Sequence, residues 1–247
     1  MRSAIDLNSD LGEGAGADAE IMPLVTSANI ACGAHAGDEA MMETTVALAL
    51  RHRVAIGAHP GYRDAANFGR TPLDIPAEAL HADIRAQLEA LRAVAARAGG
   101  LVTRVKAHGA LYNQGERNDA VAGTIARAVA DVDPRLVLVA PPASAMARAA
   151  EKAGLRLARE GFIDRAYEAD GTLRSRRLPG ALITDPAAAA AQARSFVIDG
   201  GVIAQGGRFL PLEVDTLCVH GDTPGAASIL RAVRAALVAG GIAVRGS

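Results

Sequence analysis

The chain has 247 residues, 50% of them hydrophobic, with a formal net charge of −1, two cysteines and no apolar stretch long enough for a signal peptide or a membrane span. These values predict one soluble, cytoplasmic domain over residues 1–247, because α/β barrels reach about 250 residues as a single unit. They exclude a disulfide framework, a membrane protein and a protein with a basic nucleic-acid-binding surface.

Short apolar runs typical of strands alternate with segments of helical periodicity, which predicts βα units and a parallel sheet. We expect strands at Ile5–Asn8, Ala28–Ala31, Val54–Ala58, Val102–Ala107, Leu136–Ala140, Leu155–Arg159 and Thr216–Val219. We expect helices at about Asp38–His52, Ile75–Arg97, Asn118–Val132, Ala143–Ala153, Pro186–Ile198 and Pro224–Ala239. Seven strands with polar groups after so many of them favour a seven-stranded TIM-like (β/α) barrel, regular or distorted, over an open doubly wound sheet.

Two segments interrupt this alternation. Asn67–Ile75 is expected to be a loop, and Gly161–Gly180 is a longer irregular insertion. Loops of about 20 residues within a compact domain are uncommon and are typically lids or binding loops. A hairpin formed by Val202–Ala204 and Phe209–Leu210 is expected before the last strand.

Polar residues follow or end five of the expected strands. The segments concerned are Ile5–Glu13, Asn29–Asp38, Ile56–Gly61, Val105–Asn113 and Cys218–Asp222. In a parallel barrel the carboxyl ends of all strands lie on one rim, where residues from distant parts of the sequence form the active site. The sequence therefore predicts an enzyme.

The first of these segments supplies a carboxylate cluster. Asn8 and Asp10 are two residues apart, so in an extended strand both point to the same side. Glu13 follows in a glycine-rich turn, where the backbone can approach a ligand closely. Asp10 is a candidate general base or metal ligand, and an Asx-turn or a helix cap is the structural alternative.

Four of the six histidines come at strand ends, and they are His35, His59, His108 and His220. The other two, His52 and His81, fall in helical stretches and are expected at the surface or in packing contacts. Imidazole titrates near neutrality and binds transition metals, so acid–base and metal-binding roles are both open. If a metal is bound, Asp10, His59 and His108 are the candidate ligands, although no HExxH-type spacing supports one.

Lys106 precedes His108 by two residues and shares its side of the strand. Because a buried unpaired lysine is costly, Lys106 must either pair with a rim carboxylate or bind an anionic group of the substrate. Cys32 is expected to be a small buried apolar residue rather than a nucleophile.

Phosphate binding would need an unusual arrangement in this chain. There is no GxxxxGK(S/T) motif and no GxGxxG motif after the first strand, which excludes P-loop and Rossmann sites. Any phosphate contact would come from Lys106, Arg70, Arg165 or the Arg174–Arg177 group, unless these arginines are simply solvated.

The ordered motifs resemble those of the LamB/YcsF family. The resemblance is carried by Asp6–Glu13, Asn29–Gly33, His35–Asp38, Gly57–Gly61, Phe68–Arg70, His108–Asn113, Asp164–Arg165 with Tyr167, and Cys218–Asp222. Ser9 stands where a cysteine is expected and Ala107 where a proline is usual, which indicates that a thiol is not required at position 9.

The resemblance implies a seven-stranded barrel similar to those of metal-dependent carbohydrate deacetylases. It also implies ATP-dependent opening of the 5-oxoproline lactam to L-glutamate, with ATP and Mg²⁺ as co-substrate and two further subunits, B and C, as partners. A homo-oligomer is compatible with this arrangement. The resemblance leaves open which chain binds ATP.

Our hypothesis assigns Asp10 as base or base orienter, His59 and His108 as acid–base or ligand groups, and Lys106 as anion stabiliser. The residues expected to bind substrate are Asn8, Glu13, Asn29, His35, Arg70, Tyr112, Asp164, Arg165, His220 and Asp222. Two alternatives are a divalent-metal deacetylase or amide hydrolase acting on a carbohydrate-like substrate, and a non-catalytic subunit that binds substrate for its partners.

Overall fold

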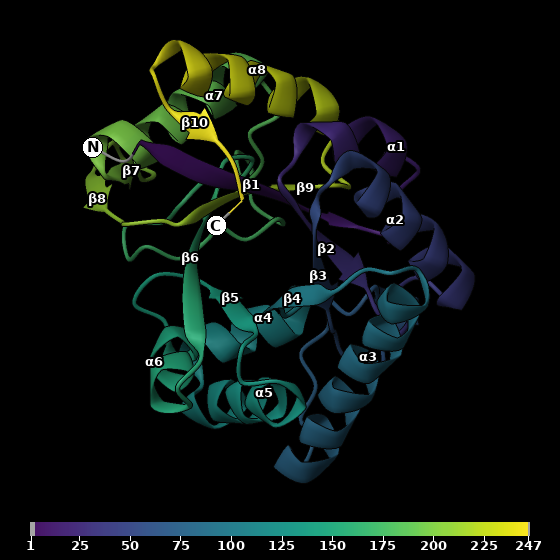
Figure 1. The fold of residues 1–247 in the computed structure, drawn as a ribbon. Helices are drawn as coiled ribbons and strands as arrows, with labels where there is room; N and C mark the ends of the chain where they lie inside the picture. The colour runs from purple at the N-terminus through teal and green to yellow at the C-terminus, as the bar shows by residue number, and fades with distance from the viewer. Residues whose placement is uncertain (1–2, 247) are drawn as a thin grey trace.

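The first strand of the chain closes the main sheet, because it pairs in parallel with both the second and the ninth strand. In this computed structural model, which describes residues 3–246, β1 (Ala4–Leu11) lies between β2 (Ser27–Ala31) and β9 (Thr216–His220). The strands follow the order β1-β2-β3-β4-β5-β6-β9 around the barrel, and every pair is parallel. Helices surround this ring (Figure 1). The predicted seven-stranded (β/α) barrel is confirmed, and it is closed rather than incomplete.

The remaining elements complete the βα pattern. The other barrel strands are β3 (Ala55–His59), β4 (Val102–Lys106), β5 (Val137–Ala140) and β6 (Arg156–Phe162). The helices are α1 (Asp18–Ile21), α2 (Glu39–His52), α3 (Ala77–Arg97), α4 (Gly109–Arg117), α5 (Asp119–Val132), α6 (Ala145–Lys152), α7 (Pro186–Arg194) and α8 (Ala226–Ala239). The antiparallel hairpin consists of β7 (Gly201–Ile203) and β8 (Phe209–Pro211), and β10 (Ala243–Val244) pairs with β1. Within residues 3–246, every helix is too short or too polar to cross a membrane.

Two strands are longer than the sequence predicted, and the difference concerns the site. β1 continues to Leu11 rather than ending at Asn8, so Asp10 lies inside the strand. β6 continues to Phe162 rather than ending at Arg159. The added residues include charged ones, which apolar runs cannot identify as strand, and they are buried because they face the barrel interior.

The structure contains one site-bordering helix that the sequence did not predict. This is α4, which begins directly after the strand β4 and carries Gly109 and Gly115. Glycine lowers helix propensity by about 1 kcal/mol relative to alanine, which hides such a helix from periodicity. The insertion at Gly161–Gly180 is largely irregular beyond the end of β6, as predicted.

The barrel interior is polar, whereas the apolar core lies between the strands and the helices. On β1, Leu7 belongs to the apolar core, but Asp6 is hydrogen-bonded to Arg104 of β4. Because β1 and β4 are not neighbours in the sheet, a side-chain bond between them must cross the interior. On β4, Val105 lies in the core, and Lys106 crosses to β1 like Arg104. Alternation along each strand therefore separates an apolar outer side from a charged inner side.

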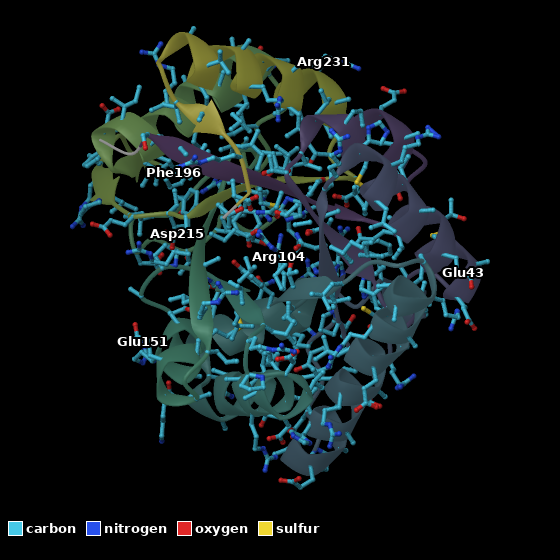
Figure 2. The ribbon with its side chains drawn as sticks, in the orientation of Figure 1. Glu43, Arg104, Glu151, Phe196, Asp215 and Arg231 are labelled. Atoms are coloured by element: carbon cyan, nitrogen blue, oxygen red, sulfur yellow. The ribbon has the colours of Figure 1, made fainter. Side chains whose placement is uncertain are left out.

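Asp6 and Arg104 form the lower charged layer of this interior (Figure 2). Asp6 Oδ2 accepts hydrogen bonds from Arg104 Nη1 at 2.8 Å, Ser27 Oγ at 2.8 Å and Thr216 Oγ1 at 2.6 Å. Gly57 on β3 leaves room for the arginine, because a Cβ atom there would lie 2.8 Å from Arg104 Cγ. A buried ion pair is tolerated only when its remaining donors and acceptors are satisfied, as they are for Asp6 Oδ2.

We expect Gly57→Ala to lower the free energy of unfolding by about 1–3 kcal/mol, because the added methyl group overpacks the interior against Arg104 and the Ala28 carbonyl. The matched control is Gly123→Ala in α5, where a Cβ atom meets nothing within 4 Å. It should raise the same free energy by about 0.5–1 kcal/mol, because alanine favours a helix over glycine. Urea unfolding measures both, and equal changes in the two variants would contradict the packing of the interior.

Candidate active site at the carboxyl ends of the strands

A cavity of about 530 Å³ opens at the carboxyl ends of the barrel strands. Its polar lining includes Asp10, Glu13, His59, Arg70, Lys106, His108, Tyr112, Arg165, Arg176 and His220. These residues come from the ends of β1, β3, β4 and β9 and from the loops and the helix α4 that follow strands. The arrangement is the one in which parallel barrels build active sites from distant parts of the sequence.

Lys106 is the charged centre of the upper interior. Its Nζ lies 2.9 Å from Asp10 Oδ1, 2.9 Å from Glu160 Oε1 and 3.1 Å from Cys218 Sγ, and the side chain is 2% exposed. Burial alone would lower the pKa of Lys106, but the charges of Asp10 and Glu160 hold it well above its usual value. Of its two predicted roles, the structure therefore places Lys106 in an ion pair with a rim carboxylate.

The two carboxylates beside Lys106 differ in their surroundings. Burial would raise the pKa of Asp10, but the charges of His59 and Lys106 hold it well below its usual value. Burial raises the pKa of Glu160 despite Lys106, and Tyr112 Oη donates to Glu160 Oε2 at 2.8 Å. Asp10 is thus the carboxylate that stays ionised at the cavity surface.

Asn8 and Asn29 hold Asp10 from below. Asn29 Nδ2 donates to Asp10 Oδ1 at 2.9 Å and to Asn8 Oδ1 at 2.8 Å, so Asn8 and Asp10 share one side of β1 as predicted. Asn8 Nδ2 in turn donates to Thr216 Oγ1 at 2.7 Å. Both asparagines are fully buried, and they orient the carboxylate rather than line the cavity.

Glu13 and three histidines gather beside Asp10. His59 Nε2 lies 3.0 Å from His108 Nδ1, and Glu13 Oε1 lies 3.1 Å from His108 Nδ1 and 3.6 Å from His59 Nε2. His35 Nε2 lies 3.1 Å from Glu13 Oε1, and the ring of His35 stacks on that of His108. All four donor atoms lie within 4.8 Å of one another, so these residues could hold a metal ion. Asp10, which the sequence suggested as a ligand, borders this group with Oδ2 at 3.5 Å from His59 Nε2.

The cluster combines a carboxylate with neutral imidazoles. Burial lowers the pKa of His59 to about 3, so this ring is neutral near pH 7. Burial also lowers the pKa of His35. For Glu13, burial would raise the pKa, but hydrogen bonds with His108 and His35 bring it below its usual value. The cluster is therefore rich in electron pairs and poor in protons.

Two glycines make the histidine arrangement possible. A Cβ atom on Gly61 would lie 2.7 Å from His35 Nδ1, and one on Gly69 would lie 2.7 Å from His35 Cβ and 3.0 Å from His108 Cδ2. Gly69 also has φ +61°, which favours glycine. The glycines after β3 in the sequence motifs thus have a packing role at the site.

Arginines surround the mouth of the cavity. Arg70 and Arg176 both pair with Asp222, which lies at the rim. Arg165 is buried and donates through Nη2 to the Arg174 carbonyl, but its Nε has no hydrogen-bond partner among residues 3–246. Burial and the positive charge of Arg176 lower the pKa of Arg165. An anionic group of a ligand would supply the missing acceptor.

Asp164 holds His220 at the opposite wall. Asp164 Oδ2 accepts hydrogen bonds from the His220 backbone N–H at 3.0 Å, from Thr223 Oγ1 at 2.6 Å and from His220 Nδ1 at 2.9 Å. The Nδ1 bond fixes the tautomer and leaves His220 Nε2 for other contacts. Asp164 is fully buried and does not line the cavity itself.

The predicted substrate-binding residues therefore divide into two groups. Those that line the cavity are Glu13, Arg70, Tyr112, Arg165 and His220. Those that stand behind the lining or at the outer rim are Asn8, Asn29, His35, Asp164 and Asp222. Contact of any of these residues with substrate stays a prediction.

Sequence reasoning missed Glu160, although it pairs with Lys106. The predicted strand ended at Arg159, and continuing the period-two alternation of β6 would have pointed Glu160 and Phe162 to the interior. Cys32 is buried, and burial raises the pKa of its thiol to about 12, as suits the predicted apolar role.

Comparison with known proteins identifies the family. The model of the LamB/YcsF family matches residues 5–247. The chain belongs to the LamB/YcsF family. The matched range contains every motif that carried the resemblance in the sequence, so that resemblance is confirmed.

Similar proteins cover the chain almost completely. Two relatives that bear the name of the A subunit of 5-oxoprolinase come from Symbiobacterium thermophilum, 51% identical over 97% of this chain and 94% of the relative, and Methylococcus capsulatus, 49% identical over 99% and 96%. The solved structure of a lactam utilization protein from Thermus thermophilus is 43% identical, with a TM-score of 0.93 over 99% of this chain and 100% of that one. A family 4 carbohydrate esterase from Streptomyces lividans shares the fold alone, with 9% identity and a TM-score of 0.52 over 98% and 91%.

We expect Lys106→Met to lower the free energy of unfolding by about 3–5 kcal/mol, because it leaves Asp10 and Glu160 buried without their shared cation. Adding Glu160→Gln to this variant should recover part of the loss. The control Lys152→Met, on the exposed end of α6, should change stability by less than about 0.5 kcal/mol. Urea unfolding measures all three, and a loss in Lys106→Met no larger than in the control would contradict the central ion pair.

Proposed function

We propose that this chain opens the lactam ring of 5-oxoproline by hydrolysis, giving L-glutamate, as the A subunit of an ATP-dependent 5-oxoprolinase. Subunits B and C complete the enzyme, and ATP with Mg²⁺ is the co-substrate. The observation that carries this proposal is the cavity at the barrel rim, where proton acceptors and unsatisfied arginine donors face one space. The names of the relatives support a lactam as the substrate.

The two kinds of groups in the cavity match the two functional groups of the substrate. 5-Oxoproline has a carboxylate on one side of its ring nitrogen and the lactam carbonyl on the other. Arg165 offers its Nε to the carboxylate, with Arg70 and Arg176 close by at the mouth. The lactam carbonyl then lies toward Glu13 and the histidines. A cavity of about 530 Å³ holds this small ring with room for an added phosphoryl group.

ATP is needed because resonance stabilises an unstrained lactam against attack by water. Transfer of the γ-phosphoryl group to the lactam oxygen releases ADP and makes the ring carbon electrophilic. Water adds to that carbon, the C–N bond breaks to give an acyl phosphate, and a second water releases phosphate and glutamate. The chain lacks the P-loop motif, so we assign the phosphoryl transfer to the partner subunits and the water steps to this cavity.

Asp10 is the proposed acceptor of the proton from the attacking water. It is ionised, lies in the cavity lining and is fixed by Asn29 and Lys106. Lys106 keeps the negative charge on Asp10 and stabilises the anionic oxygen that develops during attack. His59 and His108 place their free ring nitrogens beside Asp10, where they bind or orient the water.

A divalent-metal amide hydrolase acting on a carbohydrate-like substrate is the second candidate function. The cluster of Glu13 with three histidines favours it, because such donor sets bind catalytic metals. This enzyme would release acetate from an N-acetylated sugar without ATP. The requirement for ATP therefore separates the two functions.

The deciding experiment combines the purified chain with 5-oxoproline and ATP, with and without subunits B and C, and measures glutamate and phosphate. We expect glutamate only in the complete mixture. Asp10→Asn should lower glutamate formation by about 10²–10⁴-fold, the range for loss of a general base. The control Asp131→Asn changes a half-exposed carboxylate that pairs with His81 far from the cavity, and should keep full activity.

Absence of glutamate in every combination would contradict the proposed activity. Normal turnover by Asp10→Asn in the assembled complex would instead mean that this chain binds substrate for its partners. Acetate release from an N-acetylated sugar without ATP would favour the second candidate.

A further inference from the structure

We propose that Glu13, His59 and His108 bind one divalent transition-metal ion such as Zn²⁺, with the fourth coordination position open to the cavity. The proposal deepens the hydrolytic role proposed above, because it concerns the same cavity and names a group that can activate water. It differs from the set suggested by the sequence in replacing Asp10 with Glu13.

Backbone hydrogen bonds fix which ring nitrogens are free. His59 Nδ1 donates to the Lys106 carbonyl at 2.8 Å, and His108 Nε2 donates to the Phe68 carbonyl at 2.8 Å. Each ring, when neutral, then has its electron pair on the other nitrogen. These nitrogens, His59 Nε2 and His108 Nδ1, lie 3.0 Å apart. Two electron pairs at this distance repel each other unless a cation lies between them, and a carbonyl partner behind each ring is typical of metal-binding histidines.

The three donor atoms have the spacing of a tetrahedral site. Glu13 Oε1, His59 Nε2 and His108 Nδ1 form a triangle with sides of 3.0, 3.1 and 3.6 Å. Ligand atoms bound at about 2.0–2.1 Å to a tetrahedral zinc ion lie about 3.3–3.4 Å from one another. The triangle is therefore close to the required size before any ion is bound.

Charge in the upper interior also favours a cation. Asp10, Glu13 and Glu160 carry three negative charges against the one positive charge of Lys106, a formal sum of −2 with neutral histidines. Among the residues that the structure describes, only Lys106 and histidines lie within ion-pair distance of these carboxylates. A divalent ion would balance this charge, whereas one proton on a histidine would balance half of it.

His35 has a positioning role in this arrangement. Its Nε2 donates to Glu13 Oε1 at 3.1 Å, and its ring stacks at 3.6 Å on His108. The three proposed ligands line the cavity, but His35 does not. Glu13 and His108 are thus held from behind by His35, and the open position lies on the side where substrate enters. When bound, the ion supplies Lewis acidity that lowers the pKa of water.

The test titrates the intact chain, stripped of metal with EDTA, with Zn²⁺ and with Co²⁺ by calorimetry and visible absorption, with no substrate present. We expect one ion per chain and, with Co²⁺, the intense visible bands of a four-coordinate site. Glu13→Gln and His59→Gln should each lower the affinity by at least about 100-fold. Circular dichroism checks that each variant is folded.

Two controls isolate coordination from charge. Glu160→Gln removes a buried carboxylate from the same interior without touching the triangle, and should change the affinity by less than about 10-fold. His81→Gln, which removes a histidine paired with Asp131 outside the barrel, should not change it. Should Glu13→Gln fail to fold, the stoichiometry and the cobalt spectrum of the unmodified chain still decide.

Absence of stoichiometric binding by the unmodified chain would overturn the proposal, as would undiminished binding by folded Glu13→Gln, which would mark an adventitious surface site. Because the titration uses no lactam, its outcome is independent of the proposed activity. A chain that binds the ion but yields no glutamate with its partners contradicts the lactam proposal alone.

Discussion

The ammonium group of Lys106 is the interaction on which the upper barrel interior depends. A buried charge is costly unless it is paired, and Lys106 is paired on two sides, with Asp10 from β1 and Glu160 from β6. These strands lie on different sides of β4 around the ring, so the ion pairs connect walls that share no backbone hydrogen bonds. The Asp6–Arg104 pair repeats this connection one layer below. The interior is held by charge, and the apolar core stays outside it.

This charged interior gives the cavity two ends of opposite character. Its base is rich in carboxylates and imidazole electron pairs, and its mouth carries Arg70, Arg165 and Arg176. A small substrate with a carboxylate at one side and an amide carbonyl at the other fits this polarity. Hydrolysis needs the same separation, because the group that receives the proton and the group that binds the anion must not neutralise each other.

The sequence predicted the barrel and the meeting of its strand ends, because βα alternation and polar residues after strands are local signals. It could not predict the partners of Lys106, since Glu160 lies in a charged stretch that carries no apolar signal of strand. It also placed Asp10 rather than Glu13 with the histidines, because the path of the turn after β1 depends on tertiary contacts. Which predicted residues only support the lining, such as Asn29 and Asp164, likewise depends on depth in the interior.

The central claim is that the lactam is opened in the cavity at the carboxyl ends of the strands. A crystal structure of the chain with bound 5-oxoproline tests it most directly. The account predicts the ligand inside the cavity, with its carboxylate hydrogen-bonded to Arg165 and its lactam carbonyl facing Glu13, His59 and His108. A ligand bound elsewhere on the molecule, with this cavity filled only by water, would contradict it.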